Sequence, residues 1–251
     1  GLEPSATLAL SELSAELARQ GREVYRFGFG QSPFPVPASV VQALKNHAAE
    51  KDYLPVLGLP LLRRTVAEFL QGFGHQSVDE QGIMVGPGSK ELMFLLQLCW
   101  DGRVLLPSPS WVSYVPQSQI LGRQYRLLAT TAENRYKVKA EDLEAHLQAE
   151  PEDHGALLIL NYPANPDGCS YAAEELAALA EVARRYNLTL LSDEIYSLLS
   201  YDNKPVSIAH FYPEGTIVST GLSKWCGAGG WRLGCFAFPE RLFALRDAVA
   251  V

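Results

Sequence analysis

Residues 156–193 read ALLILNYPANPDGCSYAAEELAALAEVARRYNLTLLSD. Two short apolar runs, at 156–161 and 188–193, flank a stretch at 173–187 in which apolar residues recur every three or four positions. The short runs are typical of buried β-strands, and the periodic stretch is typical of a helix with one buried face. Strand, helix and strand in this order indicate a βα unit of a mainly parallel sheet.

The same alternation extends along the chain from about residue 80 onward. It predicts the α/β fold class, with a mainly parallel sheet and helices on both of its faces. The further strands are expected at 82–86, 103–107, 215–220 and 234–238, and the further helices at 89–100 and 139–150.

The first 80 residues show a different pattern. Helical periodicity at about 7–20, 38–50 and 59–73 is interrupted by the Pro- and Gly-rich stretch FGFGQSPFPVPAS at 27–39. Proline and glycine at this density favour loops over regular elements. We therefore expect this region to form a clamp or lid and not a sheet.

Composition narrows the class of protein. The chain of 251 residues is 47% hydrophobic, and its formal charge of -7 comes without any basic block. This balance argues against nucleic-acid and membrane-surface partners and favours a small molecule. The four cysteines form no CxxC pair and the five histidines have no metal-ligand spacing, so we expect no metal and reduced, cytoplasmic thiols. No apolar run approaches the roughly 20 residues of a membrane span.

The first predicted strand is followed by a glycine-containing turn, GPGSK, at 86–90. Ligands of open α/β sheets bind outside the carboxyl ends of the strands. Ser89 and Lys90 open a helix there, and the free N–H groups and dipole of a helix N-terminus attract anions. We expect a phosphate group at this position.

The later strands are also followed by polar residues. Lys224 stands among small residues in STGLSKWCGAGGWRLG at 219–234, unlike a lysine that serves only solubility. Because several features converge on one edge of one sheet, helix capping alone does not account for them. The residues are Asn161, Asn165, Asp193, Tyr196, Lys224 and Arg232.

Pyridoxal 5′-phosphate fits this set of groups, which comprises an anion-binding helix start, an amide, a carboxylate, a phenol, a lysine and a second cation. Lys224 would form an imine with the aldehyde, and Asp193 would keep the ring nitrogen protonated, which makes the ring an electron sink. Arg232 would grip the phosphate. A low-dielectric pocket and a neighbouring cation promote loss of the lysine proton from a reference pKa of about 10.4.

The stretch GLSKWCGAGGWRLG at 221–234 resembles the pyridoxal-phosphate attachment signature of class I and II aminotransferases, which are fold-type I enzymes. Other motifs of that family precede it, in the order that the family shows, over nearly the whole chain. They are FGFGQSPFPVPASV (27–40), YLPVLGLPLLRRTVAEFL (53–70), VGPGSKELM (85–93), PSPSWVSYVPQ (107–117), LILNYPANPDGCSY (158–171) and SDEIYSLLSYD (192–202).

The resemblance implies a role for each matching residue. Lys224 is the implied Schiff-base lysine and proton shuttle, and Asp193 is the implied partner of the pyridine nitrogen. Asn165 and Tyr196 would bond the phenolic oxygen of the ring, and Trp111 would lie on the ring. The implied catalytic residues are Lys224, Asp193 and Tyr196, and the implied phosphate contacts are Gly88, Ser89, Lys90 and Arg232.

The resemblance also implies a homodimer, because Tyr53 matches a tyrosine that reaches the phosphate of the neighbouring subunit. It assigns residues 1–50 to a small domain or lid and residues 51–251 to the cofactor-binding large domain. Two positions depart from the family pattern. Gly221 stands where a hydroxyl residue is frequent, with Ser219, Thr220 and Ser223 nearby as substitutes, and Asp167 stands where threonine is usual.

Family members continue beyond the attachment lysine into a C-terminal small domain, which carries an arginine for the substrate carboxylate. We therefore expect these 251 residues to be the large domain of a longer enzyme that does not transaminate alone. Three functions stay open. The first is transfer of an amino group between an amino acid and a 2-oxo acid, the second a lyase or synthase of the same fold, and the third a non-catalytic cofactor-binding module.

Overall fold

A computed structural model describes residues 6–25, 27–28, 30–75, 77–201 and 205–251. The described residues form one sheet of seven strands in the order β1-β7-β6-β5-β4-β2-β3. The strands are β1 (Ile83–Gly86), β2 (Val104–Ser108), β3 (Tyr125–Ala129), β4 (Leu157–Asn161), β5 (Thr189–Asp193), β6 (Thr216–Gly221) and β7 (Gly234–Ala237).

The sheet is mainly parallel, as the sequence predicts. Strands β3, β2, β4, β5 and β6 all pair in parallel, whereas β7 pairs antiparallel with both β6 and β1. A parallel pair needs a crossover, usually an α-helix. Between β6 and β7 the chain forms only the short 3₁₀ turn η5 (Gly229–Trp231), so β7 runs back beside β6.

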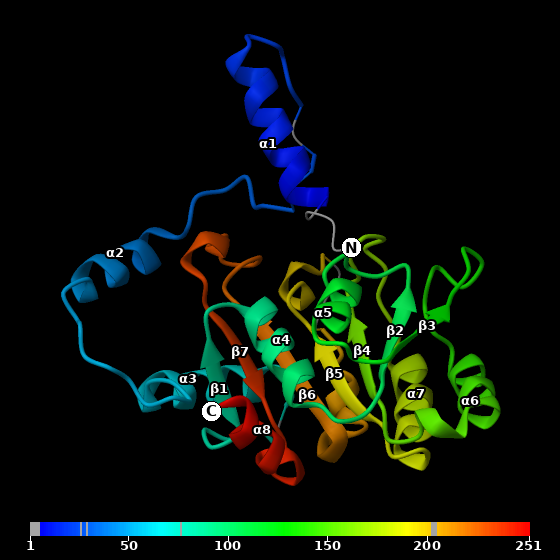
Figure 1. The fold of residues 1–251 in the computed structure, drawn as a ribbon. Coiled ribbons are helices and arrows are strands. Elements are labelled where there is room, and N and C mark those ends of the chain that lie inside the picture. The colour runs from blue at the N-terminus through cyan, green and yellow to red at the C-terminus, as the bar shows by residue number, and fades with distance from the viewer. Residues whose placement is uncertain (1–5, 26, 29, 76, 202–204) are drawn as a thin grey trace.

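Helices cover both faces of the sheet (Figure 1). The face that carries Leu157, Ile159 and Leu191 packs against α4 (Ser89–Cys99), α5 (Tyr114–Ile120) and α8 (Phe243–Val249). The opposite face carries Leu158 and Leu190 and packs against α6 (Ala140–Ala149) and α7 (Ala173–Arg185). This arrangement confirms the predicted α/β class with helices on both faces.

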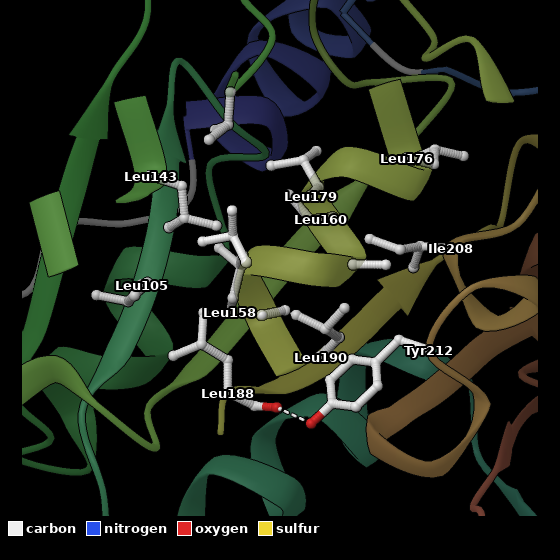
Figure 2. Close-up of a cluster of buried hydrophobic side chains, with 14 of the residues drawn as sticks. Leu105, Leu143, Leu158, Leu160, Leu176, Leu179, Leu188, Leu190, Ile208 and Tyr212 are labelled. Atoms are coloured by element: carbon white, nitrogen blue, oxygen red, sulfur yellow. Dashed lines mark hydrogen bonds between the residues drawn. The ribbon is translucent and has the colours of Figure 1, made fainter. Parts of the chain in front are cut away.

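The cluster beneath α6 and α7 is the apolar core shown in Figure 2. Leu158 and Leu190, from adjacent strands, are fully buried in it. Tyr212 lies at its edge and donates its hydroxyl to the Leu188 carbonyl oxygen at 3.0 Å, so that this buried phenol keeps a partner. The alternation of side chains along β4 and β5 sends neighbouring residues into different clusters.

The sequence patterns did not predict two elements. Strand β3 lies at the edge of the sheet, and only Leu128 of its five residues is buried, so its apolar signal is weak. Helix α5 has only seven residues and contains Pro116, which is tolerated because it lies in the first turn. Both elements lie between predicted ones and leave the order of the predicted strands unchanged.

The N-terminal region contains α1 (Ala6–Arg19), α2 (Ala38–His47) and α3 (Pro60–Gly72). Helix α3 packs on the sheet through Ala67 and Leu70, which join a cluster with residues of β1, β6 and β7. Helix α2 buries none of its residues. Figure 1 shows α1 and α2 standing away from the sheet.

Candidate active site

The carboxyl ends of β4, β5 and β6 lie side by side at one edge of the sheet. Asn161 pairs in register with Asp193, and Asp193 pairs with Ser219. Asp193 is 3% exposed. The structure thus places a buried carboxyl group at the edge where open α/β sheets bind their ligands.

Asp193 accepts hydrogen bonds from two neighbouring elements. Tyr114 Oη donates to Asp193 Oδ2 at 2.7 Å, and Ser219 Oγ donates to Oδ1 at 3.4 Å. Burial raises the pKa of Asp193 from 3.8 to about 6, although the bonds from Tyr114, the Ile195 amide and Ser219 oppose this. A cation placed beside Asp193 would offset the desolvation and favour the carboxylate.

Asn165 and Tyr196 lie together beside this carboxyl. Asn165 Nδ2 is 3.4 Å from Tyr196 Oη, and the Asn165 amide donates to Asn161 Oδ1 at 2.7 Å. Asn161 Nδ2 in turn donates to the Asp193 carbonyl oxygen at 2.9 Å. This series of bonds fixes an amide and a phenol next to the end of β5.

Lys224 follows β6 and reaches the same place. Its Nζ lies 5.1 Å from the centre of the Tyr196 ring and donates to the Gly30 carbonyl oxygen at 2.8 Å. The bond joins residues that are 194 positions apart. The lysine amine is therefore held at the site by the N-terminal region, next to Tyr196.

Gly88, Ser89 and Arg232 form a second group at the start of α4. No side chain caps this helix, and Gly88 has φ +93°, which favours glycine. A Cβ on Gly88 would lie 2.1 Å from Arg232 Nη2, and a Cβ on Gly234 would lie 2.2 Å from the Ser89 amide nitrogen. Only glycines allow this approach.

Arg232 itself has a left-handed backbone, with φ +57°. Such a conformation costs a non-glycine residue free energy and is frequent at functional sites. Its Nη1 donates to the Gly229 carbonyl oxygen at 2.7 Å. The guanidinium is thereby held against the uncapped start of α4, where cation and helix dipole would both attract an anion.

Trp111 and Lys90 connect the two groups. The Trp111 ring meets the Tyr114 ring edge to face, with centroids 5.4 Å apart and planes at 87°. Lys90 Nζ lies 5.7 Å from the centre of the Trp111 ring. The exposed Lys90 side chain is thus next to the predicted stacking residue, at the second position of α4.

Tyr53 is fully exposed, at 105%, in the segment between α2 and α3. Within the described part of the chain, no site residue forms a hydrogen bond or ring contact with it. Its predicted role across a dimer interface stays a prediction.

The two departures from the family pattern have structural explanations. A Cβ on Gly221 would lie 2.6 Å from the Leu233 carbonyl oxygen, so a hydroxyl residue does not fit there. Of the proposed substitutes, Ser219 is engaged with Asp193. Asp167 Oδ1 accepts from the Cys169 amide at 2.8 Å, which makes a local turn and leaves Asn165 at the site.

Sequence reasoning missed Tyr114 and Gly30. Tyr114 is fully buried, and burial together with the Asp193 charge raises its pKa well above 10, so it stays a hydrogen-bond donor. Its position three residues after Trp111, inside the quoted motif, was the available signal. Gly30 contributes a carbonyl oxygen, which no residue type reveals.

The arrangement fits pyridoxal 5′-phosphate. The buried carboxyl of Asp193 suits a protonated ring nitrogen, Asn165 and Tyr196 suit a ring oxygen, and the Arg232 group at α4 suits a phosphate. Lys224 offers an amine between them. A pocket beside Asn165 is lined by residues of the loops after β2, β3 and β4, among them Ser110, Lys137 and Asp167.

Comparisons with known proteins agree with this fit. A family model described as aminotransferase class I and II matches residues 22–250. An aspartate aminotransferase of Geobacillus stearothermophilus is 34% identical over 95% of the chain. An asparagine–oxo-acid transaminase of Streptococcus mutans is 32% identical over 99% of the chain. An aspartate aminotransferase structure from Thermus thermophilus with maleate has a TM-score of 0.91 and 31% identity over 99% of the chain.

The chain spans only part of these relatives, namely 62% of the Geobacillus protein and 65% of each of the other two. None of the described helices is long and apolar enough to cross a membrane. The family match includes, in one continuous span, all of the site residues from the start of α4 through Asp193 and Lys224 to Arg232. The chain belongs to the class I and II aminotransferases, a family of enzymes whose cofactor is pyridoxal 5′-phosphate.

Proposed function

We propose that this protein is a pyridoxal-phosphate-dependent aminotransferase that moves an amino group between an amino acid and a 2-oxo acid, with Lys224 as the lysine that binds the cofactor covalently. One observation carries the proposal. A series of contacts runs from Lys224 through Tyr196, Asn165 and Asn161 to the backbone carbonyl oxygen of Asp193. It supports the placement of the amine and of the residue whose carboxyl this chemistry requires at one edge of the sheet.

Each group of residues would hold one part of the cofactor. Arg232, Gly88 and Ser89 would receive the phosphate at the start of α4, and Trp111 would cover the ring. Asn165 and Tyr196 would hold the phenolic oxygen. When bound, pyridoxal phosphate supplies an aldehyde that condenses with amines and a ring that withdraws electrons from the substrate α-carbon.

Asp193 would hold a proton at the ring nitrogen. Because burial disfavours the bare carboxylate, a cationic ring nitrogen is a favourable partner, and the pair would remain charged at neutral pH. Tyr114 would keep the carboxylate oriented through its short bond to Oδ2. The charge on the ring is what makes it an effective electron sink.

Once the substrate amine has replaced it on the cofactor, the freed amine of Lys224 would take the proton from the substrate α-carbon and return it at a neighbouring atom. A general base must lie within hydrogen-bond reach of the proton that it removes. The Gly30 carbonyl and the Tyr196 ring restrict the lysine to this side of the site. Orientation of this kind contributes several kcal/mol to catalysis in general.

The names of relatives suggest a first substrate. Several are described as aspartate or aspartate/prephenate aminotransferases, and one as an asparagine transaminase. We therefore propose a small amino acid with a polar side chain as the donor, with aspartate as the first to be tested.

Assembly and location are part of the same proposal. We infer a homodimer in which the exposed Tyr53 reaches the partner's phosphate, with residues 1–50 as a lid and 51–251 as the cofactor-binding domain. The four cysteines are all free, which suits a cytoplasmic protein.

The test is a half-reaction. The cofactor-loaded protein is mixed with aspartate, asparagine and an aromatic amino acid, and the cofactor absorbance is followed with product analysis. Formation of aminated cofactor and a 2-oxo acid supports an aminotransferase. Release of an elimination product instead would favour a lyase. A protein that holds cofactor without responding to any donor would fit a binding module, or a cofactor-binding domain that does not transaminate alone.

A further inference from the structure

A second buried carboxyl lies directly behind the site. Glu194 follows Asp193 in the chain, and its side chain is 5% exposed. Asp193 points to the face of the sheet that carries Tyr114, whereas Glu194 points to the opposite face, toward Tyr162 and Ser207. The proposed chemistry gives this second carboxyl no role.

Glu194 is held on several sides by polar side chains. Its Oε1 accepts from Ser192 Oγ at 2.7 Å and from Ser207 Oγ, and its Oε2 lies 3.4 Å from His75 Nε2. Tyr162 extends the cluster, because its hydroxyl bonds Ser192 Oγ at 2.6 Å and accepts from the Ile208 amide. Glu194 therefore connects the end of β5 with Ser207, just before η3 (Ile208–His210), and with His75, which follows α3.

His75 is the residue that completes this cluster. It is 6% exposed, its ring stacks on His210 with centroids 5.4 Å apart, and its Nδ1 is buried without a hydrogen-bond partner among the described residues. His75 Nε2 is thus the ring atom that faces the Glu194 carboxyl group.

Stability does not explain this cluster. A buried charged group with polar partners is often no more stabilising than apolar side chains of the same volume. The surrounding core on this face is apolar, with Leu190 and Ile208 fully buried nearby. The position of Glu194, back to back with Asp193 across β5, indicates a connection with the site.

The backbone of Glu194 supports this connection. Its amide donates to the Ser219 carbonyl oxygen at 2.9 Å, and its carbonyl oxygen accepts from the Ser197 amide at 3.0 Å. The turn between these two bonds carries Tyr196. Fixing the Glu194 side chain thus fixes the segment that presents both Asp193 and Tyr196.

We propose that Glu194 is a positioning residue for the active site: from the face of β5 opposite Asp193, and with Ser192 and Ser207 as its donors, it fixes the turn that carries Asp193 and Tyr196. This inference rests on the proposed function, because it assigns Glu194 to the support of that site.

The proposal has an electrostatic consequence. The titratable groups near Glu194 are His75 and Tyr162, with His210 stacked on His75, and the titratable groups near the Asp193 carboxyl are Tyr114 and Glu194 itself. The nearby negative charge of Glu194 contributes, after burial, to the raised pKa of Asp193. Removing that charge lowers the pKa of Asp193.

Two substitutions of Glu194 distinguish the effect of its hydrogen bonds from the effect of its negative charge. Glu194→Gln keeps acceptors for Ser192 and Ser207 and removes the charge, whereas Glu194→Leu removes both. Glu214→Gln is the matched control, because Glu214 pairs with Arg184 at 2.8 Å and has no bond to the 193–196 turn. His75→Phe removes the imidazole nitrogen that faces Glu194 and keeps a ring for stacking on His210.

The first measurement needs no cofactor. The carboxyl carbon of Asp193 is titrated by NMR in the cofactor-free chain labelled at aspartate, and the signal is assigned by its loss in Asp193→Asn. We expect a midpoint of about 6 that moves to lower pH in Glu194→Gln and stays in place in Glu214→Gln. An unchanged midpoint in both Glu194→Gln and Glu194→Leu would overturn the inference even if the protein neither binds cofactor nor transaminates.

The second measurement uses the cofactor-loaded chain. We expect Glu194→Leu to lower cofactor affinity by about 10- to 100-fold, since the loss of a charged hydrogen bond changes affinity by about this factor. Glu194→Gln should recover most of the loss, and His75→Phe should lie between them. If Glu194→Leu does not fold, His75→Phe carries this arm. A purely structural role would lower Tm in these variants and leave cofactor affinity at the level of Glu214→Gln, which would contradict the inference.

Discussion

Tyr114 donates a hydrogen bond of 2.7 Å to Asp193 Oδ2, from a helix that begins 79 positions earlier in the chain. Both residues are almost completely buried. The bond opposes the desolvation that raises the pKa of Asp193, so the two residues together set the pH at which the carboxylate forms. Because the carboxylate is the form that holds a protonated ring nitrogen, this pH also governs cofactor affinity.

The first prediction follows from that bond. Tyr114→Phe removes a donor to the carboxylate, so the pKa of Asp193 should rise further above about 6. Cofactor affinity should then reach its plateau at a higher pH than in the parent chain. The measurement is the Kd of the cofactor from pH 5 to 8. Tyr125→Phe serves as the control, since the Tyr125 hydroxyl accepts from Gln119 at the edge strand and, among the described residues, bonds no site residue. Equal shifts in both variants would refute the prediction.

The second prediction concerns stability without cofactor. A carboxyl whose pKa is raised by folding stabilises the protein fully below its unfolded pKa and loses that contribution as the pH rises through its folded pKa. For Asp193 the window runs from 3.8 to about 6. The loss over this window is about 3 kcal/mol, since one pKa unit corresponds to about 1.36 kcal/mol.

Asp193→Asn should remove this pH dependence, because an amide does not titrate. Urea unfolding of the parent chain and the variant from pH 4 to 7 gives the difference, in which the other titrating groups cancel. Asp142→Asn, on the exposed face of α6, should keep the parent slope. Parallel curves for Asp193→Asn and its parent would show that Asp193 titrates normally.

The sheet edge was predictable because each strand is a short apolar run and ligands bind at the strand ends. The strand order was not predictable, because it depends on pairing between distant segments. Strand β3 and helix α5 were not predictable either, because Leu128 is the only buried residue of β3 and α5 has only seven residues. The contact of Lys224 with Gly30 depends on a backbone carbonyl, and the cluster around Glu194 on long-range packing. Residue types alone give no signal for either.

The third prediction concerns the covalent attachment. Lys224→Ala should abolish the absorbance of lysine-bound cofactor and leave weak binding through the phosphate contacts at Arg232 and α4. Borohydride reduction of the loaded parent followed by peptide mapping should label Lys224. Lys45→Ala, on the exposed surface of α2, should behave as the parent. A label on Lys90 or any other lysine would remove Lys224 from the mechanism.

The last prediction separates backbone strain from loss of the anion seat. Gly88 and Gly122 both have positive φ, of +93° and +64°, so alanine is strained at either position. At Gly88 the new Cβ would lie 2.1 Å from Arg232 Nη2, whereas at Gly122 it would meet nothing within 4 Å. Gly88→Ala must therefore displace the guanidinium, and Gly122→Ala must not.

Loss of a charged hydrogen bond is worth about 1.5–3 kcal/mol, so Gly88→Ala and Arg232→Ala should each weaken cofactor binding by about 10- to 100-fold. Gly122→Ala should lower Tm and leave the Kd for cofactor unchanged. Equal Kd values in the two glycine variants would show that the phosphate is held elsewhere.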